Sequence, residues 1–289
     1  QVTSANTAFS DVGLDIEIQN VGIYLLGDDS TLTGSQALDA MEARSGIFSG
    51  LDAKLARKPD LFIHYSTKAV ADTGGIAILG GQVNDGIIDF KNLYESGTNV
   101  GVVSIDNSSL TLVHEVGHLM GLSHSRRQAQ GPVSATFPWA VGYGLDANFS
   151  TVMAYESAFN DAQGMRFFST PDRWCGGPGI TKTPCGIDDL DTLNGAYSVK
   201  ALKATALQIS AISNGLLPVV AVIGSDPLYI SDANLASDLK AAAVDLEDGD
   251  ISSSITSNIV NGNPSRGYDY EQIYTVVDSD NNVGKASRK

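Results

Sequence analysis

Charged side chains, cysteine, histidine and long apolar runs are all scarce in this sequence. Its 289 residues include only 18% charged residues, two cysteines and four histidines. No apolar run approaches the roughly 18 residues that a membrane-spanning helix needs, so we expect no membrane span. The N-terminus also lacks the basic segment followed by an apolar stretch that is typical of a signal peptide. We therefore expect Gln1 to begin either a cytosolic protein or a mature form that has lost its targeting segment.

Positive charge is especially scarce. The chain has 18 Lys and Arg against 33 Asp and Glu, which gives a formal net charge of −15. A field of this sign repels phosphate backbones and anionic lipid surfaces, which argues against nucleic acid and membranes as partners. Apolar residues make up 43% and glycine is plentiful at 30 residues, so the composition predicts a structured, loop-rich protein with a real core.

The two cysteines, Cys175 and Cys185, enclose the irregular segment "CGGPGITKTPC". A pair that closes a short loop of this kind predicts a disulfide, the alternative being two unrelated free thiols. A disulfide in turn indicates an oxidising compartment. We therefore expect the protein to be secreted or extracellular.

Apolar periodicity divides the chain into two parts. Strands are predicted at 15–26, 61–66, 75–81 and 100–106, and helices at 36–57, 109–121 and 189–213. This alternation predicts an α/β (α+β) domain with a mixed twisted sheet and long helices over residues 1–216. From Leu217 onward, short alternating runs separated by acidic turns predict a small all-β sandwich over residues 217–289.

The segment "HEVGHLMGLSH", residues 114–124, carries the clearest chemistry. His114 and His118 are four positions apart, so on a helix they project from one face and can bind the same zinc ion. Glu115 is placed to act as general base, taking a proton as zinc-bound water attacks a carbonyl. Gly121 lets the chain turn sharply and bring His124 back as a third ligand, which leaves one coordination position open.

The extended spacing H-E-x-x-H-x-x-G-x-x-H is more specific than H-E-x-x-H alone. Three of the four histidines fall within these eleven residues. The alternatives are a surface helix with solvated histidines and a metal site that is only structural. His64, the fourth histidine, lies in a strand-like run and is predicted to be a packing or hydrogen-bonding residue.

This motif resembles the signature of the metzincin zinc peptidases, which also have a methionine-containing turn beneath the metal. "STVMAY", residues 150–155, is similar to that turn. The resemblance implies that Met153 forms an apolar floor under the imidazoles. It also implies that Tyr155 reaches the metal or stabilises an oxyanion, as in some metzincins but not in others.

Two further segments indicate which family of metzincins the chain resembles. "FSTPDRWCGGPGITKTPCG", residues 168–186, resembles the bacterial reprolysin-like (M12B-type) secreted peptidases. "GIAILGG" is similar to the edge strand that lines the cleft above the zinc, which implies that Ala77, Ile78 and Leu79 contact a peptide substrate. Ser125 departs from the reprolysin pattern, which usually has Asp after the third histidine, and is more typical of matrixins.

Residues 218–289 resemble the bacterial immunoglobulin-like modules that are appended to secreted proteins. The acidic turns of this part could supply oxygen ligands for Ca²⁺, or could simply be solvated turns. The residues concerned are Asp245, Glu247, Asp248, Asp250, Asp278 and Asp280. The module could attach the protein to a surface or matrix, or act only as a spacer.

These observations predict a secreted zinc metalloendopeptidase that hydrolyses peptide bonds in extracellular proteins, with Glu115 as its base. The first alternative is a catalytically weak surface- or matrix-binding protein that works through its C-terminal module. The second is that the three imidazoles bind a divalent metal other than zinc.

Overall fold

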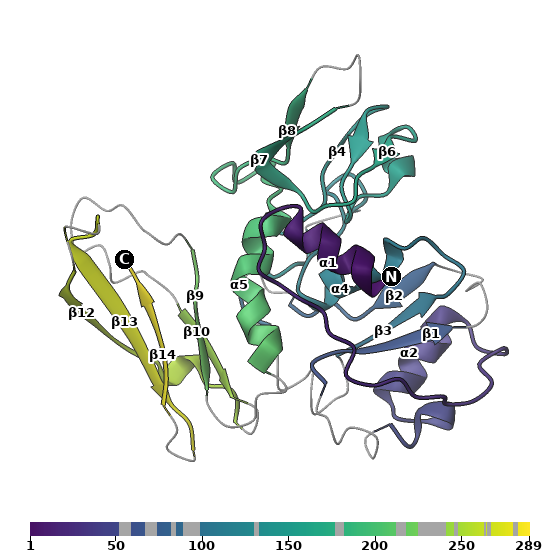
Figure 1. Ribbon diagram of the computed structural model, residues 1–289, viewed down its shortest axis with the longest axis horizontal. Helices are drawn as coiled ribbons and strands as arrows, with labels where there is room; N and C mark the ends of the chain where they lie inside the picture. The colour runs from purple at the N-terminus through teal and green to yellow at the C-terminus, as the bar shows by residue number, and fades with distance from the viewer. Residues whose placement is uncertain are drawn as a thin grey trace.

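The computed structural model describes most of the chain. The described residues are 1–51, 59–66, 74–81, 85–88, 99–129, 133–176, 182–211, 218–224, 241–245, 248–262, 264, 267–279 and 283–289. The C-terminal strands lie on one side of helix α5 (Ser198–Ala211), and the N-terminal elements, coloured purple to blue, lie on its opposite side (Figure 1). Within the described residues, no helix is long and apolar enough to cross a membrane.

The described residues of the first part of the chain build a mixed three-stranded sheet. Its order is β1-β3-β2, and its strands are β1 (Phe62–Ser66), β2 (Gly75–Ala77) and β3 (Val100–Ser104). The central strand β3 runs parallel to β1 and antiparallel to β2, which lies at the edge of the described sheet. The predicted mixed sheet is therefore confirmed, although the strand predicted at 75–81 ends at Ala77 because the chain then turns towards helix α4 (Thr111–Leu119).

Helices cover both faces of this sheet. Val100 and Val102 of β3 belong to a buried cluster with residues of α2 (Gly34–Glu42). Val103, which points to the opposite face, belongs to the cluster that includes residues of α4. The alternation along β3 therefore places α2 and α4 on opposite sides of the sheet.

Helix α2 is shorter than predicted. It begins at a capping box, in which the Thr33 hydroxyl accepts from the Gln36 N–H and the Gln36 side chain accepts from the Thr33 N–H. The single helix predicted at 36–57 is wrong, because Arg44 (φ 49°) and Gly46 (φ 57°) take left-handed backbone conformations that end it. A 3₁₀ turn follows at Gly46–Phe48, and residues 52–57 of the prediction lie outside the described part.

The N-terminal segment also differs from the prediction. A helix that was not predicted, α1 (Val2–Ser10), buries Ala5, Ala8 and Phe9 in the same cluster as α4. The strand predicted at 15–26 is wrong, because these residues form neither a strand nor a helix. Ile18 instead bonds through its N–H (2.8 Å) and its C=O (3.0 Å) to the Asn6 side chain.

The region between α4 and α5 had little periodicity and forms short strands. They are β4 (Gly144–Leu145), β5 (Phe149–Ser150), β6 (Gln163–Gly164), β7 (Thr170–Cys175) and β8 (Thr183–Cys185), with a 3₁₀ turn at Glu156–Phe159. Strands β7 and β8 pair antiparallel and are joined by the Cys175–Cys185 disulfide, which confirms the predicted pairing.

Helix α5 starts later than predicted. The helix predicted at 189–213 begins only at Ser198, and residues 212–213 lie outside the described part. Before it, the side chain of Asp188 accepts from the N–H of Leu190, and that of Asp191 accepts from the N–H of Asn194, both at 2.9 Å. These side-chain bonds stabilise turns in competition with the helix.

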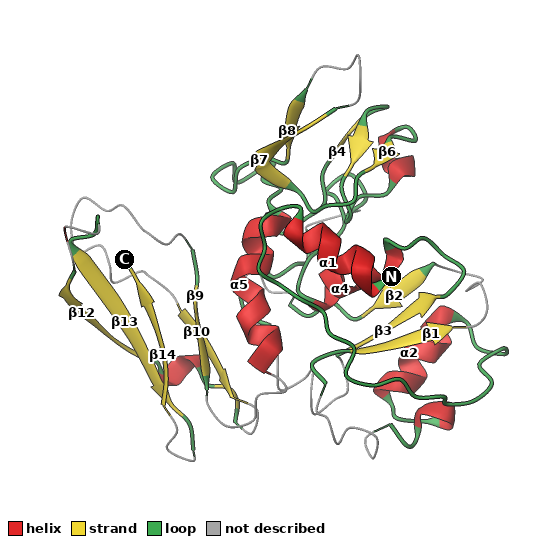
Figure 2. Ribbon diagram, in the orientation of Figure 1, coloured by secondary structure: helices red, strands yellow, loops and turns green. Residues whose placement is uncertain are grey.

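Among its described residues, the C-terminal part forms two three-stranded sheets, ordered β11-β10-β9 and β12-β13-β14. Figure 2 shows these strands in yellow. Their strands are β9 (Val219–Val222), β10 (Ala241–Asp245), β11 (Gly249–Asp250), β12 (Thr256–Asn261), β13 (Tyr270–Val277) and β14 (Val283–Arg288), with a 3₁₀ turn at Ser252–Ser254. Val220, Ala243, Tyr274 and Val276 form a buried cluster between strands of both sheets. The immunoglobulin-like assignment stays a prediction.

The C-terminal part shares a core with the rest of the protein. Val244 of β10 is buried in the same cluster as Leu202 and Ile209 of α5, and Val219 and Ile223 pack against that cluster. The chain segment that joins the two predicted domains, residues 212–217, lies outside the described residues.

Candidate metal centre

Helix α4 and the turn after it carry three histidines. Leu112, Val113 and Val116 anchor one face of the helix in the core, so that His114 and His118 project from another face. The helix ends in a turn at Gly121, whose φ of 84° suits glycine. The Gly121 N–H donates to the His118 carbonyl at 2.9 Å, and the chain then returns with His124 beneath the helix.

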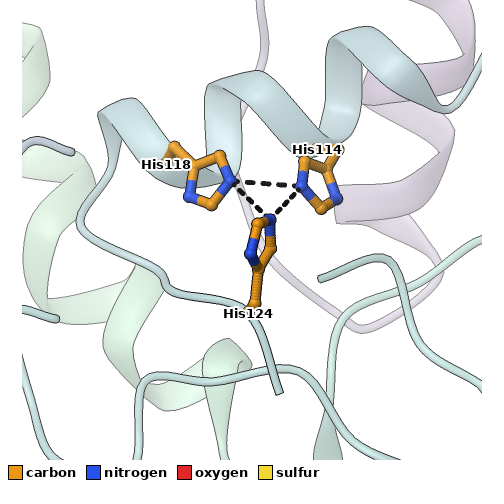
Figure 3. A group of neighbouring side chains, drawn as sticks. All are labelled: His114, His118 and His124. Carbon is orange, nitrogen blue, oxygen red and sulfur yellow. Dashed lines mark hydrogen bonds between the residues drawn. The ribbon is translucent and has the colours of Figure 1, made fainter. Parts of the chain in front are cut away.

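The three imidazoles meet at one point (Figure 3). The Nε2 atom of His114 is 3.0 Å from that of His124 and 3.1 Å from that of His118, and the last two are 3.1 Å apart. Among the described residues, no other group of three or more His, Cys, Asp or Glu brings its ligand atoms within 4.8 Å of one another. The three residues predicted as metal ligands are therefore brought together.

Backbone carbonyls set the tautomers of two rings. The Nδ1 atom of His114 lies 2.8 Å from the Val152 carbonyl, and that of His118 lies 2.8 Å from the Leu122 carbonyl. A carbonyl oxygen only accepts, so each Nδ1 carries the proton and each Nε2 presents a lone pair. Lone pairs that converge on one point repel each other unless a cation lies between them. The donor set therefore fits a metal ion, and three nitrogen ligands at this spacing suit zinc.

Burial keeps the three rings neutral. It lowers the pKa of His114 to about 4 and that of His118 to about 3, and it also lowers the pKa of His124. Each pKa falls chiefly because a buried imidazolium loses its hydration. Neutral imidazole is the form that binds metals, so the site is ready for an ion at neutral pH.

Glu115 lies between the helix and the edge strand and is only 3% exposed. Burial raises the pKa of its carboxyl to about 8. An added Cβ at Gly75 of β2 would lie 2.5 Å from Glu115 Oε1, so the absence of a side chain at Gly75 makes room for the carboxylate. A buried carboxylate with a perturbed pKa beside converging imidazoles is typical of a catalytic site.

The segment 152–155 closes the site from the other side. Met153 is fully buried, and an added Cβ at Gly117 would lie 2.5 Å from its sulfur, so the thioether packs under α4. The ring of Tyr155 lies over the histidines, with its centroid 4.7 Å from that of His124 and 5.6 Å from that of His114. Tyr155 is 48% exposed, so its other side remains accessible to solvent.

The predicted cleft residues lie next to α4. Ala77 ends the edge strand, and the Ile78 N–H continues its pairing by donating to the Val100 carbonyl at 3.3 Å. Beyond Leu79, the Gly80 N–H donates to the His118 carbonyl at 2.9 Å. The segment that contains the predicted substrate contacts is thus bonded, through Gly80, to the helix that carries His114 and His118.

Comparison with known proteins finds a family model that is similar to the N-terminal part of the chain. Residues 1–125 match the model of metallopeptidase family M12B, reprolysin-like. The predicted resemblance is confirmed over these residues. The match includes Glu115 and all three histidines, whereas the segments around Met153 and Cys175 lie beyond it.

One relative is the peptidyl-Asp metalloendopeptidase of Pseudomonas aeruginosa, 33% identical over 120 residues. This alignment covers 38% of the present chain and 18% of the relative, so the chain spans less than a fifth of that protein. No solved structure matches the chain.

Sequence reasoning missed the residues that orient the ligands. The carbonyls of Val152 and Leu122, which bond the His114 and His118 rings, carried no signal in the sequence, because any residue offers a carbonyl. His64 lies away from the triad, 3.0 Å from Asp29 Oδ2 and edge-on to Phe48, which agrees with its predicted hydrogen-bonding and packing role.

The predicted calcium ligands are only partly described. Glu247 and Asp280 lie outside the described residues. Asp248 accepts from the Ser279 N–H, and its own N–H donates to Asp245 Oδ1 at 3.1 Å. The bond between Asp248 and Asp245 is that of a local acidic turn, whereas the bond to Ser279 joins segments 31 residues apart. Calcium binding stays a prediction.

Proposed function

We propose that the chain is a zinc-dependent endopeptidase that hydrolyses peptide bonds in extracellular proteins, with the metal held by His114, His118 and His124. The observation that carries the proposal is the convergence of three Nε2 atoms within 3.1 Å beside a buried carboxylate. The family match over residues 1–125 supports a hydrolase of this class.

The residues of the site have separate tasks. When bound, zinc supplies a Lewis acid that polarises the scissile carbonyl and favours the ionised forms of the attacking water and of Glu115. Glu115 accepts a proton from that water and returns it to the leaving amine. The Val152 and Leu122 carbonyls hold the His114 and His118 rings with Nε2 facing inward. Ala77, Ile78 and Leu79 offer a strand edge to the substrate backbone.

Tyr155 is the proposed second catalytic residue. Its ring covers His124 and His114, while nearly half of the residue stays exposed. A phenol in this position can donate a hydrogen bond to the oxyanion that forms as water adds to the carbonyl. Burial and the charge of Glu115 raise the pKa of the phenol, which keeps it protonated as a donor.

The remaining proposals concern the whole protein. The Cys175–Cys185 disulfide supports a secreted, extracellular location. We keep the division into a peptidase domain (1–216) and an immunoglobulin-like module (217–289) that attaches the protein to a surface or matrix. The two-sheet arrangement of the C-terminal strands supports this division, and calcium binding there remains part of the proposal.

Replacing Glu115 tests the peptidase function. Glu115→Gln keeps the shape of the side chain but cannot accept the proton, so we expect kcat on casein to fall by about 10²–10⁴-fold. Glu17→Gln, on the exposed surface, serves as the matched control and should keep wild-type activity. Elemental analysis should find one zinc ion in all three proteins. Wild-type activity in zinc-loaded Glu115→Gln would rule out the proposed base.

A second experiment separates hydrolysis from binding. A mixed peptide library digested with the wild-type protein should give products that disappear with a chelator and return with zinc. Peptides that contain aspartate belong in this library because of the name of the Pseudomonas relative. Full zinc occupancy with no cleavage of any peptide or protein would favour a surface-binding protein instead.

A further inference from the structure

A glutamine outside the three-histidine motif links the two segments that build the metal centre. Gln128 lies four residues after His124, in the loop that leaves the site. Its Oε1 accepts from the hydroxyl of Ser125 at 2.6 Å and from the backbone N–H of Tyr155 at 3.0 Å. The bond to Tyr155 spans 27 residues of sequence and connects the loop after the third histidine to the turn that contains Met153.

The chemistry of these bonds fixes the orientation of the amide. The Tyr155 N–H can only donate, so the atom that faces it must be the Gln128 oxygen and not the nitrogen. Ser125 is 2% exposed, and its hydroxyl donates to the same oxygen, which holds the side chain in place. The Nε2 atom of Gln128 is buried and has no hydrogen-bond partner among the described residues. Gln128 is therefore attached to its neighbours through its oxygen.

This bond acts on the residue whose ring covers the metal ligands. Tyr155 begins the 3₁₀ turn at Glu156–Phe159, and its backbone direction decides where the phenol lies. The ring is tilted against His124 at a centroid distance of 4.7 Å. Gln128 and His124 lie on the same short loop, so the bond from Tyr155 to Gln128 ties the phenol to the third histidine.

We propose that Gln128 is a positioning residue that holds Tyr155 over His124 and so sets the place of the phenol at the proposed catalytic site. The catalytic part of this inference rests on the proposed peptidase function, whereas the positioning part can be measured without activity. The position taken by Ser125, where reprolysin-like sequences usually have Asp, is explained in the same way, because its hydroxyl holds Gln128.

Histidine NMR tests the positioning directly. The chain has four histidines, so labelling with ¹³C-histidine gives four ring Cε1–Hε1 signals from the zinc-loaded protein. The Tyr155 ring current shifts the His124 signal, and Tyr155→Ala gives the reference for its loss. Gln128→Met keeps the length of the side chain but lacks the acceptor oxygen. It should therefore move the His124 signal most of the way from its wild-type position to its position in Tyr155→Ala. Gln128→Glu keeps an acceptor oxygen and should leave the signal near its wild-type position.

The remaining histidine supplies an internal control for folding. His64 lies in β1, away from the triad, so its signal should not change in any of these variants. A His124 signal that stays at the wild-type position in Gln128→Met, or that moves as far in Gln128→Glu, would overturn the proposal. If His64 also moves, Ser125→Ala replaces the Met variant, since it removes the bond that holds Gln128 and should shift His124 in the same direction. No shift in Ser125→Ala would then overturn the proposal.

Kinetics test the consequence for catalysis. Gln128→Met should lower kcat more than it changes KM, because the phenol acts after the substrate is bound. In a Tyr155→Phe background, which lacks the hydroxyl, the same substitution should cause no further loss of kcat. Equal losses in the two backgrounds would mean that Gln128 has only a structural role. Absence of peptidase activity in the wild-type protein would contradict the proposed function. The NMR result would still decide whether Gln128 positions Tyr155.

Discussion

Gly117 lies against the thioether of Met153 so closely that an added Cβ would be 2.5 Å from the sulfur. The two residues come from the metal-binding helix and from the turn below it, and Met153 is fully buried. Alanine at a helical glycine position gains about 1 kcal/mol from helix propensity. Overpacking a filled core costs about 1–3 kcal/mol. We expect this cost to exceed the gain in helix propensity, because the buried thioether leaves no space for the added methyl group.

We therefore predict that Gly117→Ala lowers the free energy of unfolding by about 1 kcal/mol, measured by urea denaturation. Gly50→Ala is the matched control, because nothing lies within 4 Å of an added Cβ there and the residue is exposed. It should leave stability within about 0.5 kcal/mol of wild type. A Gly117→Ala protein as stable as the wild type would show that Met153 can move away, and hence that it is not a fixed floor under the ligands.

The buried histidines and the buried Glu115 should change the stability of the metal-free protein with pH in opposite directions. His114 and His118 have pKa values lowered from 6.5 to about 4 and about 3, so unfolding takes up protons as the pH falls below 6.5 and stability is lost. Glu115 has its pKa raised from 4.5 to about 8, so its contribution is complete below pH 4.5 and is lost as the pH rises towards 8. The metal-free protein should therefore be less stable both at pH 4 and at pH 8 than between them.

Glu115→Gln separates the two effects. In the presence of a chelator, this variant should gain stability relative to wild type as the pH rises from 4.5 to 8, and should lose stability below pH 6.5 as wild type does. Urea unfolding at several pH values measures both slopes, with Glu17→Gln as the surface control. A stability difference between Glu115→Gln and wild type that does not change with pH would contradict the burial of an ionisable carboxyl at this position.

The sequence predicted the metal-binding segment well because its information is local. The spacing of His114 and His118 needs only helical periodicity, and Gly121 needs only a left-handed turn before His124. The alternation of Val100, Val102 and Val103 likewise follows from burial on both faces of a strand. Local pattern and tertiary packing agree at these positions.

The predictions failed where the outcome depends on a distant partner. Residues 15–26 alternate as a strand should, yet Asn6 takes the backbone groups of Ile18 that would otherwise join a sheet. Apolar spacing favoured one helix over 36–57, but it carries no information on the left-handed conformation of Arg44. The ligand orientation depends in the same way on Val152, 38 residues from His114. One-dimensional periodicity cannot show which of these groups meet.

A buried glutamine on α5 supports the segment next to the metal centre. Gln208 is 1% exposed, its Nε2 donates to the Gly86 carbonyl and its Oε1 accepts from the Ile88 N–H, both at 2.9 Å. Ile88 is fully buried, and its Cδ1 would lie 3.1 Å from an added Cβ at Gly121, the turn between the second and third histidines. Gln208 of α5 thus holds the backbone of Gly86 and Ile88 by two hydrogen bonds, and the Ile88 side chain in turn packs against the turn at Gly121.

Gln208→Met should remove both bonds while keeping the volume, and leave two buried backbone groups without partners. Each such group costs about 1–3 kcal/mol, so we expect the two together to lower the free energy of unfolding by about 2–6 kcal/mol. Zinc affinity, measured by competition with a chelating dye, should fall because the turn that places His124 loses its support. Gln163→Met, at an exposed position in β6, should change neither quantity. Faster hydrogen exchange at the Ile88 amide would trace the loss to this contact, whereas an unchanged exchange rate would show that another group replaces Gln208.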